Sequence, residues 1–359
     1  MKPFFSIIVP CCDVETYIRE CLDSVLGQPF ADWELVAVVE TSKDRTEEIV
    51  REYAAKDSRI SVFTQPRSGS PAAPRNTALE HATGEYVIFL DSDDRIAEGS
   101  LLRLHDKIAA RPGADLYPCA IQVENEITGK SEPVRDNYPA DFNDELTGPE
   151  ATRTSFSYKR DPCPMLQLTI CRRAFLDENG LRCVPGLRRE DSEFSPRALY
   201  LAKRVVPLHE PFYIYRIRKN SIITAASGHG NYLKDCARVA QSSFAFHARI
   251  SQAPGFDRRI SPLWAKKWLN WVTFIWFSPK AIRSISRKAR RETLADVFKD
   301  GFSDFDLLVR ASTRPRKIAA VFQKLFVRHP SMGWLADAFF ICVYHPLVDL
   351  RDGLRGAGR

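Results

Sequence analysis

The stretch YVIFLDSDD at residues 86–94 decides how the first half of this 359-residue chain folds. Its first residues are apolar, as in a buried strand, and the run ends in a polar turn. Asp91, Asp93 and Asp94 repel one another at this spacing unless a cation neutralises them. Ligands of an open α/β sheet bind at the carboxyl ends of its strands. Asp91 and Asp93 are therefore a candidate site for a hard divalent metal that holds a diphosphate, and a solvated acidic turn is the alternative.

Strand and helix patterns alternate on both sides of this stretch. Short apolar runs typical of strands are separated by segments whose apolar residues recur at helical spacing. The predicted strands lie at residues 4–9, 33–39, 60–64 and 86–90, and the predicted helices at residues 14–26, 44–55, 72–82 and 100–110. This order predicts an α/β fold, a Rossmann-like, mostly parallel sheet with helices on both faces.

The pattern changes farther along the chain. Further strands are predicted at residues 115–123, 166–175 and 204–215, with a helix at 193–202. Residues 124–162 are polar and rich in Pro, Asp, Asn and Glu, so we expect a long loop or lid there. Beyond Gly230 the alternation stops and we expect helices. The sequence thus predicts two regions, residues 1–229 and residues 230–359.

The two regions differ in charge. Residues 1–229 carry 29 Lys and Arg against 35 Asp and Glu, net −6, whereas residues 230–359 carry 23 against 10, net +13. A basic region of this kind suggests an anionic partner, and the sequence shows no zinc-finger spacing or RNA-recognition motif that would make it nucleic acid. An anionic membrane surface is the partner we expect.

One predicted helix of the basic region combines aromatic and basic residues. Its aromatic face and flanking charges comprise Trp264, Lys266, Lys267, Trp268, Trp271 and Ile275, and residues 280–291 add six basic residues and no acid. Such a helix can lie in a membrane interface. Alternatively, the tryptophans pack against the region of residues 1–229 and the charges are simply solvated.

Several short motifs, taken in order, resemble glycosyltransferase family 2, whose members have the GT-A fold. The resemblance covers roughly residues 3–224. Its motifs are SIIVP at residues 6–10 followed by YIRECLDSV at 17–25, RNTAL at 75–79 with ATGEY at 82–86, LDSDD at 90–94, REDSEF at 189–194, and YRIRKNSI at 215–222. Each motif alone is weak, but their order and spacing are specific.

The resemblance implies an inverting transfer of a sugar from a nucleotide-diphosphate donor, most simply a UDP-sugar, to a glycan or lipid-linked glycan acceptor in surface polysaccharide biosynthesis, such as capsule or lipopolysaccharide. Asp91 and Asp93 would bind Mn²⁺ or Mg²⁺ opposite the leaving diphosphate. Asp191 would be the general base, although Glu190 and Asp191 can also be first-turn acids of a helix. The further donor-binding residues implied are Pro10, Asp13, Glu40, Arg75 and Ser92.

The chain departs from the family pattern after the second strand, where Val39-Glu40-Thr41-Ser42 replaces the common Asp-Asp-Gly-Ser. Glu40 then stands where an aspartate typically contacts uracil. A non-catalytic nucleotide-sugar or glycan-binding protein with a degraded donor site is therefore an alternative. A dinucleotide-dependent oxidoreductase is poorly supported, because the first turn has no Gly-x-Gly-x-x-Gly. We expect a cytoplasmic protein, at the inner face of the membrane if the basic region binds lipid.

Overall fold

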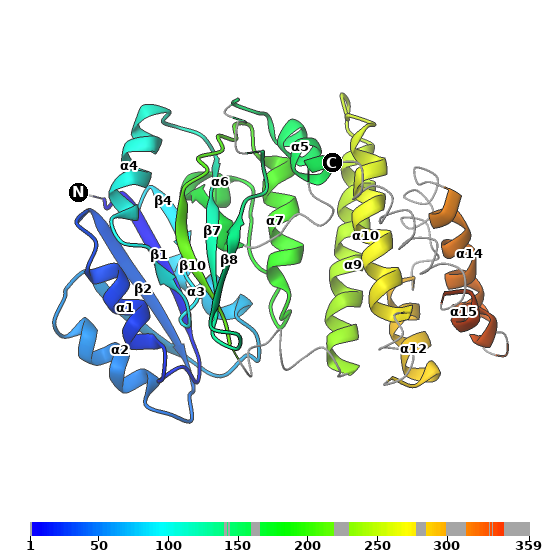
Figure 1. Cartoon of the computed structure of the whole chain (residues 1–359), viewed down its shortest axis with the longest axis horizontal. Coiled ribbons are helices and arrows are strands. Elements are labelled where there is room, and N and C mark those ends of the chain that lie inside the picture. Colours follow the sequence, from blue (N-terminus) through cyan, green and yellow to red (C-terminus); the bar gives the residue numbers. More distant parts are fainter. Residues whose placement is uncertain are drawn as a thin grey trace. The chain divides into compact units, whose positions relative to one another are not determined.

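Alternating apolar runs and amphipathic helices make the first part of the chain an α/β unit (Figure 1). The computed structural model describes residues 2–139, 142, 144–158, 166–218, 230–277, 285–298, 314–329, 331 and 333–340. The chain divides into two compact units, Met1–Ser221 and Ile222–Arg359. The described residues of the second unit form helices and their connections. The boundary predicted at residues 229/230 falls slightly later in the chain than this division.

A six-stranded, mostly parallel sheet forms the centre of the first unit, as predicted. Its order is β3-β2-β1-β4-β9-β6, in which β1 to β4 run parallel and β9 is antiparallel to both of its neighbours. The strands are β1 (Phe5–Cys11), β2 (Trp33–Glu40), β3 (Ile60–Gln65), β4 (Tyr86–Phe89), β6 (Leu116–Pro118) and β9 (Thr169–Arg172). The carboxyl ends of β1, β2 and β4 therefore meet at one edge.

Helices cover both faces of this sheet, and every residue of β1 is buried. Phe5 and Val9 of β1 pack on one face together with apolar residues of α1 (Ile18–Leu26) and α4 (Ser100–Ala110). Ile8 packs on the other face with residues of α3 (Ala72–His81), α6 (Arg173–Glu178) and α7 (Glu190–Leu201). Burial on both faces explains why β1 reads as one continuous apolar run. Helix α2 (Thr46–Ala54) completes the set before β3.

A strand of a second sheet and a helix occupy part of the described residues of segment 124–162, where a long loop or lid was expected. The order of this second sheet is β5-β10-β7-β8, with β5 (Arg95–Ile96), β7 (Ala120–Asn125), β8 (Lys130–Arg135) and β10 (Pro211–Ile217). The polar sequence KSEPVR of β8 forms the edge strand of a hairpin with β7, where charged side chains are common. Helix α5 (Gly148–Tyr158) follows. The loop prediction failed because polarity alone does not separate an edge strand from a loop.

Three predicted strands are shorter than expected, and the one predicted at residues 204–215 is found only as β10, from Pro211. Residues 115–123 divide into β6 and β7, which belong to different sheets, so Cys119 marks a change of sheet. Residues 166–175 divide into a 3₁₀ turn (Leu166–Leu168), the four residues of β9 and the start of α6. The apolar run was misassigned because buried helical and strand residues cannot be separated by composition alone.

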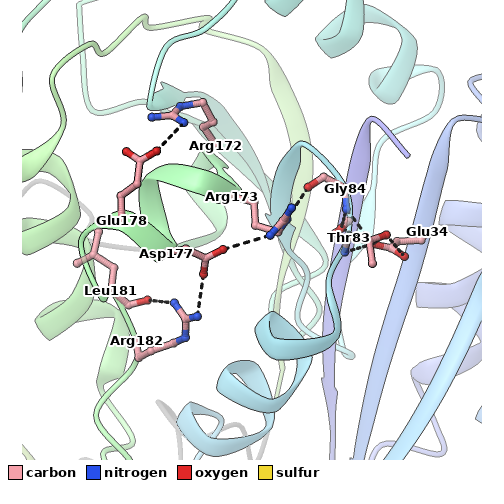
Figure 2. A network of polar contacts seen from close by, with 10 residues as sticks. Glu34, Thr83, Gly84, Arg172, Arg173, Asp177, Glu178, Leu181 and Arg182 are labelled. Atoms are coloured by element: carbon pink, nitrogen blue, oxygen red, sulfur yellow. Dashed lines mark hydrogen bonds and ion pairs between the residues drawn. The ribbon is translucent and has the colours of Figure 1, made fainter. Parts of the chain in front are cut away.

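A polar network fixes the amino end of β4, opposite the carboxylate turn (Figure 2). Arg173 donates from Nε to the Gly84 carbonyl at 2.8 Å and pairs with Asp177 at 3.1 Å. Glu34 accepts the backbone N–H groups of Thr83 and Gly84 at 2.6 and 3.0 Å. A Cβ on Gly84 would meet the backbone of β1 at 2.8–2.9 Å, so only glycine lets the chain approach this closely. The network holds β4 in register with β1.

The described part of the second unit is helical, and its described tryptophan side chains, Trp264, Trp268 and Trp276, are buried. Its described helices are α9 (Gly230–Ser251), α10 (Ile260–Phe277), α12 (Arg287–Val297), α14 (Arg314–Arg328) and α15 (Gly333–Phe339). Trp264 and Trp268 are buried, and the Trp264 indole donates to Ser243 Oγ at 2.9 Å. The Trp264 ring lies close to Phe246 and His247 of α9. The side chains of Trp271 and Ile275 lie outside the described residues.

The basic run of the second unit is only partly a solvated surface. Arg290 is buried, pairs with Asp337 at 2.9 Å and lies over the rings of Phe277 and Phe326. Lys288 is 79% exposed. Lys280 and Arg283 lie outside the described residues. Among the helices described, none is both long and apolar enough to cross a bilayer.

Candidate functional site

Asp94 anchors the acidic turn at the carboxyl end of β4. The Asp94 N–H closes the turn on the Asp91 carbonyl at 3.0 Å. The buried Asp94 carboxyl accepts the Tyr213 hydroxyl at 2.6 Å and the backbone N–H of Arg216 at 2.7 Å, both from β10. Burial and the charges of Asp93 and Asp91 raise the pKa of Asp94 well above its ordinary value. Asp94 thus connects the turn to β10 from inside the domain. Asp91 and Asp93 are the two acids of the turn that are partly exposed.

Arg75 of α3 joins Asp91 to the start of α7. Its buried guanidinium is ion-paired with both Asp91 and Glu190, and the amide of Gln167 donates to the other Asp91 oxygen. Burial disfavours the charge of Arg75, but Asp91, Cys183 and Asp191 outweigh this effect and raise the pKa of Arg75. Arg75 is thus buried inside the α/β unit rather than exposed on the surface of α3.

Glu190 and Asp191 begin α7, and their two side chains have different surroundings. Glu190 is buried against Arg75, whereas Asp191 is only partly buried. Asp191 Oδ1 accepts the N–H of Ser192 at 2.6 Å, as expected for an acid in a first helical turn. The acids of the β4 turn and of the α7 terminus therefore meet around one arginine.

The loops after β1, β2 and β3 are tied together by Asp13 and Glu40. Asp13 is exposed at φ 51°, accepts the Lys43 N–H at 2.7 Å and pairs with Arg67 at 2.6 Å. The Lys43 N–H is the main cause that lowers the pKa of Asp13. Glu40 is buried, and its Oε1 accepts the Ser68 N–H at 2.9 Å and the Gln65 amide at 3.2 Å. Glu40 therefore holds the loop after β3.

Pro10 and Ser92 lie inside the domain. Pro10 is buried within β1, paired in register with Val38 of β2. Ser92 is 5% exposed. Their side chains thus face protein rather than solvent in this structure.

Three residues at the site were given no role by the sequence. Gln167 binds Asp91. Arg216 binds the Asp93 carbonyl from Nε at 2.9 Å, and Arg218 donates from Nε to Asp93 Oδ2 at 2.8 Å. The spacing of Arg216 and Arg218, two residues apart at the end of a strand, places them on one face and could have identified them. Gln167 stands alone in an apolar run and gives no such signal.

Asp91 and Asp93 fit a divalent cation that takes its other ligands from elsewhere. In the part of the chain that the structure describes, no three His, Cys, Asp or Glu side chains are grouped to hold a metal. Mg²⁺ commonly binds one or two carboxylates together with substrate phosphates and waters. Burial and the nearby charge of Asp91 raise the pKa of Asp93, and the Arg218 guanidinium opposes this rise. A divalent cation at the turn would likewise favour the charged carboxylate.

The fold of the α/β unit is that of a GT-A glycosyltransferase. The crystal structure of Staphylococcus aureus TarS residues 1–349 in complex with UDP-GlcNAc superimposes with a TM-score of 0.70 at 22% identity, over 91% of this chain and 88% of that one. This similarity confirms the predicted fold class, with the helical region following the α/β unit.

Sequence comparison agrees with the fold. The family model "Glycosyl transferase family 2" matches residues 6–178. The Bacillus subtilis glycosyltransferase EpsJ is 33% identical over 62% of this chain and 63% of its own length. Bacillus subtilis TuaG, whose name assigns it to teichuronic acid biosynthesis, is 30% identical over 62% of this chain and 82% of its own length. The chain belongs to glycosyltransferase family 2. Its match to EpsJ spans less than two thirds of that relative's length.

Proposed function

We propose that this chain is an inverting, metal-dependent glycosyltransferase that moves a sugar from a nucleotide-diphosphate donor to a glycan acceptor. The observation that carries the proposal is the arginine bridge: Arg75 pairs with Asp91 of the β4 turn and with Glu190 of α7. It brings acids from two distant motifs to one edge of the sheet, where ligands of such sheets bind.

The two groups of acids suit the two halves of a transfer reaction. Asp93 and Asp91 would hold a divalent cation, which would supply positive charge to stabilise the leaving diphosphate. Asp191, partly exposed at the start of α7, takes the proton from the attacking acceptor hydroxyl. Glu190 cannot take this role because it is buried against Arg75. Attack opposite the leaving group inverts the anomeric carbon.

A UDP-sugar is the donor we propose, because TarS, which shares the fold, binds UDP-GlcNAc in its crystal structure. Asp13, Glu40 and the loop after β3 surround the strand ends where a base would bind. Glu40 already holds Ser68 and Gln65, so it would shape the base pocket through the loop rather than bind uracil itself. Pro10 and Ser92 would support the backbone of the pocket.

A cell-surface polysaccharide is the acceptor class we propose. TuaG is named for teichuronic acid, and TarS is named a poly(ribitol-phosphate) β-N-acetylglucosaminyltransferase. These names favour surface polymers in general, and the narrower expectation of capsule or lipopolysaccharide stays a prediction. The net +13 of residues 230–359 supports contact with an anionic membrane surface carrying a lipid-linked acceptor, on the cytoplasmic side.

The test is calorimetric titration of UDP into the protein with and without Mn²⁺, with the Asp93→Asn variant alongside. We expect Mn²⁺-dependent binding that the variant loses, followed by turnover of a UDP-sugar. Asp177→Asn, at the opposite end of the sheet, is the matched control and should bind like the wild type. Binding that needs no metal, or that survives in Asp93→Asn, would refute the metal's role.

One observation favours the alternative of a non-catalytic binding protein. The carboxylate of Glu40 is committed to the loop after β3, so the base site lacks a free acid at that position. Such a protein would bind UDP or a glycan without consuming a nucleotide sugar. Release of UDP over many turnovers, measured with an acceptor glycan, separates the two functions.

A further inference from the structure

Arg216 and Arg218 lie two residues apart at the end of β10 and on the same face. The first of them, Arg216, is held by several protein groups. Arg216 is buried and ion-paired with Glu20 and Glu126, and its Nε binds the backbone carbonyl of Asp93. Its own N–H binds Asp94. Arg216 therefore connects β10 to the acidic turn. Its guanidinium nitrogens are all bound to protein groups, so Arg216 is not available to bind a ligand.

Arg218, the second arginine, contacts the turn differently. Its Nε donates to the Asp93 side-chain oxygen Oδ2 at 2.8 Å, and its guanidinium lies over the Tyr17 ring, 4.7 Å from the centroid. The side chains of Arg218 and Asp93 are 17% and 24% exposed. The contact is thus at the open side of the turn, within reach of solvent and of ligands.

The Arg218–Asp93 pair occupies the carboxylate that the proposed function assigns to the metal. A divalent cation on Asp93 would stand beside the positive guanidinium, and like charges at such short range repel each other strongly. Asp91 is constrained as well, because the buried Arg75 and Gln167 hold its two oxygens. Metal binding at Asp93 therefore requires Arg218 to release the Asp93 carboxylate.

The donor itself provides the place to which Arg218 can move. A nucleotide diphosphate brings negative oxygens to the same cation, and a guanidinium binds phosphate with two parallel hydrogen bonds. The face of Tyr17 stabilises the guanidinium by a cation–π contact while its hydrogen-bonding edge changes partner. Arg75 cannot make this move because it is buried between Asp91 and Glu190.

We propose that Arg218 exchanges partners when the donor binds: it neutralises Asp93 in the ligand-free protein and moves to the donor diphosphate when the cation takes Asp93. This inference rests on the proposed function and adds to it a residue that couples metal binding to donor binding. Arg218 competes with the metal when no nucleotide is present and assists it once the diphosphate arrives.

The exchange of partners predicts that a single substitution, Arg218→Gln, changes the affinities for Mn²⁺ and for UDP in opposite directions. In Arg218→Gln, the affinity for Mn²⁺ alone, measured by the electron paramagnetic resonance signal of free Mn²⁺, should rise several-fold because the competitor is gone. The affinity for UDP at saturating Mn²⁺ should fall about tenfold or more, the usual loss of a charge-assisted hydrogen bond. Arg218→Lys keeps the charge, so its Mn²⁺ affinity should stay near that of the wild type while UDP binding weakens.

Arg173→Gln is the matched control. It removes an arginine–aspartate pair of similar length at the opposite end of the sheet and should leave both affinities unchanged (Figure 2). Two changes of the same sign in Arg218→Gln, or an unchanged Mn²⁺ affinity, would overturn the exchange even if the wild type binds UDP and turns over. Failure of the wild type to bind Mn²⁺ or UDP would overturn the metal-dependent function together with it.

Discussion

Arg75 and Glu190 form a buried ion pair although they come from helices far apart in the chain. The same guanidinium holds Asp91, so one cation neutralises one acid from each of two motifs. Because Arg75 and Glu190 are almost completely removed from water, their mutual attraction is weakly screened. The pair thus fixes where α7 begins relative to the β4 turn.

Replacing Arg75 should therefore destabilise the α/β unit strongly. Arg75→Met keeps the length of the side chain but leaves Glu190 buried without its cation, a change that typically costs about 3–5 kcal/mol. Urea unfolding measures the loss. Arg19→Met, which breaks the exposed pair with Glu52, is the control and should have little effect. Equal urea midpoints for the two variants would show that the ion pairs of Arg75 contribute no more to stability than an exposed ion pair does.

A second prediction concerns the contact between α5 and α7. A Cβ on Gly148 would collide with the backbone carbonyls of Leu199, Tyr200 and Ala202 at the end of α7. Gly148→Ala must push these helices apart, and overpacking of this kind costs about 1–3 kcal/mol. Gly27→Ala, where the added Cβ has one neighbour at 3.2 Å, is the control. A thermal midpoint unchanged in Gly148→Ala would contradict the close approach.

The strand and turn at residues 86–94 could be predicted because the information is local. An apolar run closed by acids specifies a strand end without knowledge of distant residues. The partner of Arg75 could not be predicted in this way, because Glu190 approaches it only after β9 and α6 have reversed the chain. Gln167 was missed for the same reason, since it contacts Asp91 across the sheet from within an apolar segment.

The second unit shows that a run of basic residues does not reveal which of them are exposed. Residues 280–291 read as one basic face, yet Arg290 points inward to Asp337. A buried arginine and an exposed one look alike in sequence, because the difference lies in a carboxylate many residues later. Periodicity predicted the helix of Trp264 and Trp268 correctly, but their packing against α9 or another surface depended on tertiary structure.

This distinction sharpens the membrane prediction. Lys288 and Arg291 also lie on α12, but unlike Arg290 they are not buried. The double variant Lys288→Gln and Arg291→Gln should therefore sediment less with phosphatidylglycerol vesicles than the wild type does. Each basic residue near an anionic surface contributes about 1 kcal/mol, and added salt should reduce binding further. Zwitterionic vesicles are the control. Equal binding of both vesicle types by the wild type would rule out an electrostatic membrane contact.

His247 should make the stability of the helical unit depend on pH. Its side chain is buried, and burial lowers the pKa of His247 from 6.5 to about 4. Between these values the unfolded chain binds the proton and the folded chain does not, so stability is lost as pH falls from about 7 towards 4, by up to about 3 kcal/mol.

The urea midpoint, followed by tryptophan fluorescence at pH 7.5 and pH 4.5, measures this dependence. His247→Gln has no proton to take up and should show a smaller drop than the wild type. His105→Gln, in the α/β unit, controls for the loss of a histidine as such. The same drop in His247→Gln and in the wild type would assign the pH dependence to other groups.

The general base makes the sharpest prediction about chemistry. Asp191→Asn should lower turnover about 10²–10⁴-fold, the usual contribution of general-base catalysis, because the amide cannot accept the proton of the acceptor hydroxyl. UDP affinity with Mn²⁺ should stay unchanged, since Asp91 and Asp93 remain. The asparagine can still accept the Ser192 N–H, so α7 keeps its first turn. If UDP affinity falls as far as turnover does, Asp191 is instead a structural residue that holds α7 in place.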